Sequence, residues 1–399
     1  SKLEDVIVIG YGTIKKSHLT GSISKVINED LDQIAVSRVD DALVGQVSGV
    51  NVQATNGEAG SAPTIQIRGV GSLNGATSPL IVVDGLVVDD DYLGSLDMTT
   101  VESFEVLKDA ASSAIYGSRG SNGIIMITTK QGDEGKTVFK YNTYTGRKEA
   151  RQSDAYRFSV AETAARELAA TGTNSAKTQY MQRIGVDNDW QNIIFNGGNI
   201  ESHALSARGG NKTTKFSTSL NYLHDEGVLL TDDFKKYGLN FKVDTKVSEK
   251  FSFGANLSPS YTKQRRFDGS THDILRQPSW LPLYLDENTI QFVNRLSYGG
   301  AYANAQVGDY AVQRMFDDYD LVTGMPVASG GTDISDTSNT NPGAKVLERH
   351  RTQDKLKMFG TVYGEYKFNN RLKFRTSFGG DFQNTDARRW QGVQASRNG

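Results

Sequence analysis

The stretch Ile115–Lys130, IYGSRGSNGIIMITTK, is the most informative part of this 399-residue sequence. It contains Gly117, Gly120 and Gly123, and it ends in the run Ile124–Thr129, whose apolar and β-branched residues are typical of a buried strand. The glycines lack both the Gly-Lys-Ser/Thr ending of a phosphate-binding loop and the Gly-x-Gly-x-x-Gly spacing of a dinucleotide site. They therefore predict tight turns at a crowded backbone.

Short elements with strong turn signals precede this stretch. Two apolar runs in Leu80–Val88 are joined by Asp84-Gly85, a two-residue hairpin signal. Arg38–Gly49 has the apolar spacing of a short amphipathic helix, and Val101–Tyr116 predicts a strand followed by a short helix. Further strands are predicted at Val50–Gln53 and within Pro63–Gly69. Residues up to about 130 therefore predict a compact α+β unit of short elements.

The chain also carries a β-branched run close to its first residue, Asp5–Thr13, DVIVIGYGT, which ends in a glycine-rich break. Such a run can add as an extra strand to the sheet edge of another protein. It can equally be an ordinary first strand of this protein's own sheet, and the pattern taken alone favours that second interpretation.

These segments resemble one known family. DVIVIGYGT, followed by Lys15 and Lys16, resembles the TonB box of SusC/RagA-type TonB-linked outer-membrane transporters. The segments VDDALVGQVSGVNV, IQIRG, PLIVVDG and VESFEVLKDAASSAIYGSRGSNGIIMITTK resemble the plug domain of that family, in the family's order. The resemblance covers residues 4 to 130, and it reverses the interpretation of the first strand. It implies that TonB binds the following residues by strand addition: Asp5, Val6, Ile7, Val8, Ile9, Gly10, Tyr11, Gly12 and Thr13.

The remaining sequence has the alternation of transmembrane β-strands. Apolar and polar residues alternate in four clear runs, Phe216–Tyr222, Tyr237–Val247, Phe251–Tyr261 and Leu372–Phe382. Short turns at 209–213, 248–250 and 369–370 alternate with long connections at 147–198, 225–235 and 267–353, as in an outer-membrane barrel. In the run from Lys355 to Phe368, Phe359 and Tyr363 break the alternation.

The predicted architecture is therefore an α+β plug followed by antiparallel transmembrane barrel strands. The predicted domains are a TonB box and linker at 1–16, a plug at 17–132, and the N-terminal part of a barrel at 133–399. About seven strands are expected here, out of about 22 in a barrel large enough to need a plug. We expect the missing strands in a longer chain. No charged n-region and apolar h-region open the sequence, so we expect any signal peptide to have been removed.

Composition excludes several classes of function. The absence of cysteine excludes disulfides, thiolate metal sites and cysteine nucleophiles, and the formal charge of 44 − 46 = −2 argues against nucleic acid as a partner. None of the five histidines lies in a metal or hydrolase motif, so no catalytic residue, metal ligand or cofactor is predicted. Asp89–Asp91 and Asp187–Asp189 could bind calcium, but they lack the EF-hand spacing and are more typical of solvated turns.

Two of the connections carry signals of their own. Asp154–Thr171 has an Asp cap and helical apolar spacing, so it predicts a helix outside the membrane. The segment from Arg266 to Arg351 has glycine clusters and aromatic residues without alternation, which is typical of a functional or disordered loop.

The plug must hold the pore shut and yet yield when it is pulled. Arg68 and Arg119 are predicted to anchor the plug to the barrel wall through lumen carboxylates such as Asp244 or Glu365. Salt bridges inside the plug are the equal alternative for both arginines. The polar plug loop Gly71–Ser78 would face the substrate cavity, and its Ser72 and Asn74 are the predicted substrate contacts.

The family resemblance implies energised import across the outer membrane of a Gram-negative, Bacteroidetes-like cell. The implied substrates are oligosaccharides or oligopeptides. The implied partners are TonB, outer-membrane lipid and a SusD-like surface lipoprotein, with a dimer of the transporter–lipoprotein pair. One alternative is a TonB-dependent receptor for a metal chelate or a vitamin. Another is a non-transporting structural or binding component of an outer-membrane assembly. Enzymatic activity is not expected.

Overall fold

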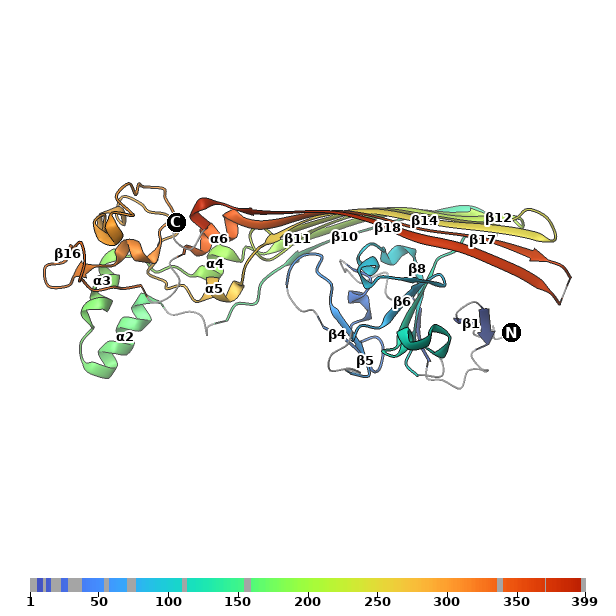
Figure 1. Ribbon diagram of the computed structural model, residues 1–399, viewed down its shortest axis with the longest axis horizontal. Coiled ribbons are helices and arrows are strands. Elements are labelled where there is room, and N and C mark those ends of the chain that lie inside the picture. Colours follow the sequence, from blue (N-terminus) through green and yellow to red (C-terminus); the bar gives the residue numbers. More distant parts are fainter. Residues whose placement is uncertain are drawn as a thin grey trace.

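A computed structural model of the chain has three parts, which are a small N-terminal unit, a long curved sheet and a group of loops and helices at one end of that sheet (Figure 1). The N-terminal unit, here called the plug (residues 23–129), lies against one face of the sheet. The loops and helices, here called the cap (residues 159–195 and 268–348), lie at the other end of the molecule from strand β1. The structure describes residues 6–9, 12–15, 23–27, 38–53, 57–69, 77–109, 113–153, 159–335, 340–369 and 371–395.

The plug is built on a five-stranded sheet of order β3-β8-β9-β6-β7, in which β6 and β9 are parallel. Its strands are β3 (Ile23–Ile27), β6 (Leu80–Val83), β7 (Leu86–Val88), β8 (Val101–Leu107) and β9 (Ile124–Thr129). Separate two-stranded ribbons are formed by β1 (Val6–Ile9) with β2 (Gly12–Lys15), and by β4 (Val50–Gln53) with β5 (Thr64–Ile67). The predicted α+β unit of short elements is confirmed.

The turn at Asp84-Gly85 joins β6 to β7 as predicted. Asp84 has φ 48° and Gly85 has φ 86°, the left-handed pair that a two-residue hairpin turn requires. The helix predicted at 38–49 was wrong, because only the 3₁₀ turn η3 (Asp41–Leu43) forms there. Gly45 and Gly49, both at positive φ, end any helical run at once. Further 3₁₀ turns are η4 (Asp90–Gly94), η5 (Met98–Thr100) and η6 (Ala114–Gly120).

The long sheet has seven antiparallel strands, each paired with its neighbour, in the order β10-β11-β12-β13-β14-β17-β18. Their bounds are β10 (Gly135–Lys148), β11 (Gly198–Gly210), β12 (Thr214–Glu226), β13 (Asp233–Lys246), β14 (Phe251–Phe267), β17 (Arg349–Lys367) and β18 (Lys373–Gln391). The seven predicted strands are confirmed, as are the long connections after β10 and β14. The connection expected to be long at 225–235 is only 227–232, because β12 and β13 extend into it. At 13 to 19 residues, these strands are far longer than those of most soluble sheets.

The two faces of this sheet differ as predicted. Large apolar side chains such as Leu220, Phe241, Leu257 and Phe378 are exposed on the face away from the plug. Polar side chains alternate with them along the strands, and in β12 to β14 those facing the plug are buried: Ser217, Ser219, Asn240, Lys242, Asn256 and Ser258. An apolar outer face and a polar inner face are the pattern of strands in a membrane barrel.

The cap is a folded unit with its own apolar core. Its helices are α2 (Val160–Thr171), α3 (Ala176–Ile184), α4 (Trp190–Ile194), α5 (Thr271–Leu275) and α6 (Pro342–Glu348), with η8 (Ile290–Phe292), η9 (Ser297–Gly299), η10 (Gln313–Phe316) and the ribbon of β15 (Tyr319–Asp320) and β16 (Met325–Pro326). Tyr180 and Trp190 of the first loop pack in one cluster with Trp280 and Phe316 of the second. The last short turn, η11 (Val393–Ala395), follows β18.

Helix α2 begins later than the sequence predicted. Ser159 caps it, accepting a hydrogen bond from the Glu162 N–H, while the Glu162 carboxylate accepts one from the Ser159 N–H. This reciprocal capping box replaces the predicted cap at Asp154, which lies outside the described residues. Among the residues that the structure describes, no helix is long and apolar enough to cross a lipid bilayer.

Candidate functional site at the contact between plug and sheet

Asp84, at the tip of the β6–β7 hairpin, joins the plug to two strands of the sheet. Its carboxylate accepts hydrogen bonds from Lys242 Nζ of β13 at 3.1 Å and from Asn256 Nδ2 of β14 at 2.9 Å. Within the plug it also accepts from the Thr129 N–H at 2.9 Å and from Thr129 Oγ1 at 2.5 Å. The long seven-stranded sheet is here called the wall. The turn that forms the hairpin thus also presents an acceptor that links β9 of the plug to the wall.

A second ionic contact lies at Asp91, in the 3₁₀ turn η4. Lys355 Nζ of β17 lies 2.5 Å from its carboxylate, and Lys357 Nζ lies 3.5 Å away. Burial opposes ionisation of Asp91, but the hydrogen bond from Lys355 and the charges of Lys357 and Lys355 outweigh it and lower the pKa of the carboxyl. The Asp89–Asp91 segment, considered above for calcium, is therefore occupied in part by lysines of the wall.

Lys236 of β13 makes a third contact, because its buried Nζ donates to the Leu96 carbonyl of the plug at 3.0 Å. Close by in the plug, Arg38 and Asp40 form a buried ion pair at 2.9 Å. Burial and the adjacent Asp40 raise the pKa of Asp41 to about 6. Lysines of the wall therefore meet an acidic side of the plug, and this charge complementarity fixes how the two parts dock.

The plug segment around Ala59 docks on the loop between β12 and β13. The Ala59 N–H donates to Asp232 Oδ2 at 2.7 Å, and Gln264 Nε2 donates to the Ala59 carbonyl at 2.7 Å. Arg266 Nη1 lies 3.3 Å from Glu58. Burial, with the charge of Glu58, raises the pKa of Asp232 to about 7, although the Ala59 N–H acts in the opposite direction. The backbone of this short segment is thus held on both sides by the wall.

Gly60 lets this segment approach the wall closely. Its φ is +70°, and a Cβ built on it would overlap the ring of Phe234 in β13. Only glycine meets both conditions without strain. Phe234 packs with Ala59, so the polar contacts at Ala59 are backed by apolar packing.

Phe359 of β17 completes the apolar core of the plug. It is fully buried in one cluster with Phe104 and Ile125, and its ring centroid lies 5.0 Å from that of Tyr92. The break in alternation at Phe359 therefore has a structural cause, because this apolar residue faces the plug rather than the outer face of the sheet. Tyr363, the second break, also faces inward and donates to Asp244 Oδ1 at 2.5 Å.

Three of the four residues predicted as plug anchors make contacts other than the predicted ones. Arg68 pairs with Asp109 inside the plug at 2.7 Å, which is the alternative role considered for it. Arg68 directly follows β5, which Figure 1 places on the side of the plug away from the sheet, and this position explains the internal pairing. Arg119 is exposed. Asp244 bonds to Tyr363, while Glu365 lies 3.4 Å from Lys373 of β18.

The other predicted sites lie at the margins of the described residues. Of the segment Asp5–Thr13, strand β1 and the start of β2 are described, and β1 pairs with β2 in a ribbon of its own. Asp5, Gly10 and Tyr11 lie outside the described residues, as do Ser72 and Asn74. At the predicted TonB box the structure therefore describes two short antiparallel strands that pair with each other.

The Asp187–Asp189 segment has a structural role. Asp187 accepts a hydrogen bond from the Val160 N–H at 3.0 Å, and Asp189 caps α4 through the N–H groups of Gln191 and Asn192. Across the described ranges, no group of three or more His, Asp or Glu side chains is placed to hold a metal ion.

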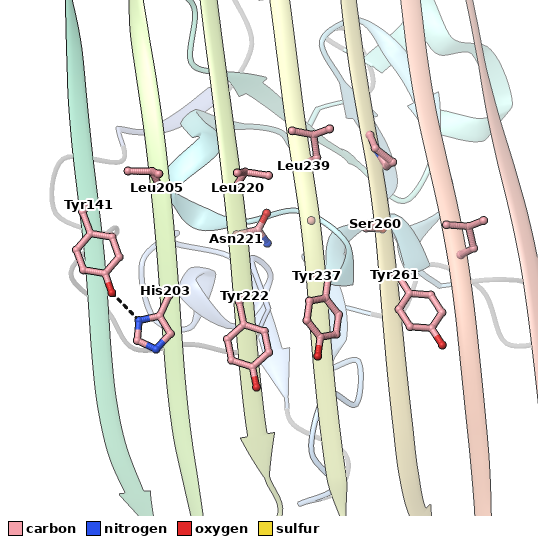
Figure 2. Close-up of a pocket in the computed structure, with 13 residues that line it drawn as sticks. Tyr141, His203, Leu205, Leu220, Asn221, Tyr222, Tyr237, Leu239, Ser260 and Tyr261 are labelled. Carbon is pink, nitrogen blue, oxygen red and sulfur yellow. Dashed lines mark hydrogen bonds between the residues drawn. The ribbon is translucent and has the colours of Figure 1, made fainter.

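A row of aromatic side chains crosses the outer face of five neighbouring strands. Figure 2 shows Tyr222, Tyr237 and Tyr261 side by side, with their hydroxyls pointing in the direction in which β12 runs, toward the cap. Tyr141 and His203 continue the row and share a hydrogen bond of 2.8 Å. Leucines line the groove beside the row, at positions 205, 220, 239 and 356.

The row lies where a membrane interface is expected. Tyr261 is ten residues from Phe251 along β14, about 34 Å of strand. At a tilt near 40° this spans about 26 Å across the bilayer, close to the apolar band of an outer-membrane barrel. The distance between the aromatic row and Phe251 is thus the one expected for the two edges of such a band.

Most of the wall contacts were not among the residues selected from the sequence. Asp84 was noted only as a turn residue, and Lys236, Lys355 and Lys357 were not predicted as contacts. One signal could have found the region, because an apolar residue at an inward position, as at Phe359, requires an apolar partner inside the barrel.

Comparisons with known proteins place these features in a family context. Residues 15–124 match the family model described as TonB-dependent Receptor Plug Domain. The chain is 31% identical over 405 residues to TonB-dependent receptor P26 of Formosa agariphila, a match that covers 98% of this chain and 36% of that protein. It is 28% identical over 407 residues to TonB-dependent receptor SusC of Bacteroides thetaiotaomicron, covering 95% and 37%. The chain thus spans about a third of the length of these curated relatives.

Solved structures show the same fold. The chain superposes on the RagAB peptide importer in its open-open state with a TM-score of 0.74 and 24% identity, covering 96% of this chain and 43% of that one. In the closed-closed state of the same importer the TM-score is 0.70, with 23% identity and coverages of 92% and 41%.

Proposed function

The chain belongs to the SusC/RagA-like TonB-dependent receptors, and from this premise we propose that it supplies the plug and the adjoining wall of a transporter that imports oligosaccharides or oligopeptides across the outer membrane. The named relatives are receptors, which supports a role other than catalysis. The observation that carries the proposal is the plug itself. Polar bonds and one phenylalanine hold it against the inner face of strands whose outer face is apolar.

TonB would engage the segment Asp5–Thr13 by strand addition and transmit the proton-motive force as a pull. This segment precedes β3 in the chain, so the pull reaches the plug through Ile23. Strand β3 lies at one edge of the plug sheet and pairs only with β8 among the described strands. It is therefore the first element of the plug sheet to bear the load.

The wall contacts would keep the other side of the plug in place. Asp84 and Thr129 lie at the end of the plug sheet where Val101 and Ile27 also lie, opposite the Ile23 end. A pull on Ile23 against an anchor at Asp84 loads the β3–β8 pairing in shear, so that all its hydrogen bonds resist together. We infer that β3 is withdrawn while β6 and β9 remain with the wall.

The partners follow from the same proposal. We propose that the full receptor works with TonB in the periplasm and with a SusD-like lipoprotein over the external mouth, as a dimer of that pair. The cap, at the end of the sheet away from β1, would form part of this mouth (Figure 1). The aromatic row would lie at the external lipid interface of the outer membrane.

The proposal is tested by Val8→Pro in the full-length receptor. Proline removes the N–H that strand addition requires, so uptake should be lost while assembly in the membrane and substrate binding persist. Val8→Thr, which keeps the N–H and the β-branched shape, is the matched control and should transport normally. Unchanged uptake by the proline variant and by a deletion of Asp5–Thr13 would contradict TonB-dependent import.

A further inference from the structure

Three arginines stand side by side on the inner face of the sheet. In the strand register, Arg266 of β14 is directly opposite Arg351 of β17, which is directly opposite Arg389 of β18. The ion pair of Arg266 with Glu58 of the plug shows that this row faces the interior. The row lies near the cap end of the sheet, beside the plug segment that begins at Glu58.

A single buried carboxylate serves most of this cluster. Asp268 lies 2.7 Å from Arg389 Nε, 3.0 Å from Arg351 Nε and 3.8 Å from Arg349 Nε. The Nε–H groups of Arg349 and Arg351 are buried and make no hydrogen bond within the part of the chain that the structure describes. One carboxylate has too few lone pairs for three guanidinium groups with five N–H donors each.

The cluster therefore carries an excess of positive charge. Among the residues that the structure describes, four guanidinium groups, of Arg266, Arg349, Arg351 and Arg389, meet two carboxylates within ion-pair distance, those of Asp268 and Glu58. Like charges directly opposite each other in a sheet are destabilising unless an anion lies between them. Arg351 and Arg389 share the inner face of the sheet with Arg266, so their guanidinium groups face the interior.

We propose that this arginine row binds an oxyanion carried by the transported substrate, a carboxylate or a sulfate group. The planar fork of a guanidinium group matches the two oxygens of such an anion, and several forks on adjacent strands can hold it together. The inference rests on the proposed function, and it narrows the substrate class to acidic oligomers. An anion bound here would lie where the wall meets the plug segment Glu58–Gly60.

The test is equilibrium binding to the purified full-length receptor at low ionic strength. The probes are a galacturonate trisaccharide and its neutral galactose counterpart, a tri-glutamate peptide and its tri-glutamine counterpart, and inorganic sulfate. We expect at least one charged trimer to bind about tenfold or more tightly than its neutral counterpart, the factor that one charge-assisted hydrogen bond provides. Added salt should reduce this preference.

The variants separate this site from general charge effects. Arg389→Gln and Arg351→Gln should each remove the preference for the charged trimer. Arg388→Gln changes the adjacent residue, which lies on the outer face and pairs with Asp386 at 2.6 Å, and should leave the preference intact. Asp268→Asn removes the competing carboxylate and should strengthen binding of the charged probes. The two arginines lie on different strands, so Arg389→Gln gives a second test if the Arg351 variant does not assemble.

Two results would overturn the inference. One is equal binding of charged and neutral trimers by the wild-type receptor, including the binding of neither. The other is an equal loss of preference in Arg388→Gln and Arg389→Gln. The proposed import would survive both results, because its own test is the dependence of uptake on the segment Asp5–Thr13. If uptake does not depend on the segment Asp5–Thr13 but the charged trimer still binds more tightly than the neutral one, the proposed import is contradicted and the anion site is retained.

Discussion

A disulfide between β3 and β8 tests directly which part of the plug moves. Lys25 and Glu105 are directly opposite each other in the register and form an ion pair at 3.5 Å. Opposed residues of antiparallel strands have Cα atoms about 4.5–5.5 Å apart, inside the range that a disulfide accepts. These 399 residues contain no cysteine, so Lys25→Cys with Glu105→Cys introduces the only pair within them.

The structure gives the scale of the effect. Five register pairs, from Ile23↔Leu107 to Ile27↔Ser103, hold β3 to β8. At about 1 kcal/mol for each hydrogen bond, the edge strand is held by about 5 kcal/mol. The disulfide closes a span of 105 − 25 = 80 residues, which adds about 4.5 kcal/mol of stability. Beyond this, a covalent link cannot be sheared apart while it remains oxidised.

The assay is uptake by cells that carry the full-length double variant, with and without a reductant. Oxidised receptor should bind substrate but not import it, and reduction should restore import. A second disulfide, from Val82→Cys with Val87→Cys, links β6 to β7 on the anchored side and should leave import unchanged. Wild-type uptake through a fully oxidised Lys25–Glu105 pair would refute withdrawal of β3.

Three further predictions concern contacts at the wall and in the cap. Phe359→Ala should destabilise the docked plug by about 3–5 kcal/mol in thermal unfolding, whereas Met358→Ala, on the opposite and exposed face, should cost far less. Because the pKa of Asp232 is raised from 3.8 to about 7, its protonated form is favoured in the folded state. The docked plug should therefore resist proteolysis best near pH 4 and lose stability as the pH rises through 7, and Asp232→Asn should flatten this profile. Asn341 is fully buried, donates to three carbonyls and caps α6. Asn341→Ala should therefore lower the stability of the cap by at least about 2 kcal/mol and open it to protease. An unchanged digestion pattern would contradict that role.

Local alternation predicted the long sheet well, because the side-chain period of a strand is fixed by its backbone. The same periodicity marked Phe359 as an exception. It could not identify Tyr92 as the partner, since the two residues lie far apart in the sequence and meet only through docking. A break in a pattern thus indicated that a contact exists without showing what makes it.

The ionic contacts of the plug were beyond sequence reasoning for a related reason. Asp84 meets Lys242 across 158 positions, and Asp91 meets Lys355 across 264. Each choice of partner depends on the register between two separately folded parts, which neither segment encodes by itself. Arg68 was predicted to anchor the plug to the wall because of its charge. The position of β5 places it next to Asp109 of the plug, with which it pairs.

The cap shows a different limit. Its two loops lack strand alternation, and most of its helices are short, so each loop taken alone resembles an irregular connection. Trp190 and Trp280 become core residues only when the two loops pack together. The apolar residues of each loop could be seen in the sequence, but four strands, β11 to β14, separate the two loops along the chain.

Phe359 also has a consequence for the order of assembly. The plug lacks one buried ring of its core until β17, the sixth strand of the sheet, has been synthesised and has docked. Under the proposed location in the outer membrane, a plug synthesised before β17 would remain incompletely packed while it crosses to the periplasm. Its final packing would then be coupled to the docking of β17, and a receptor whose sheet fails to form would expose a loosened plug to proteases.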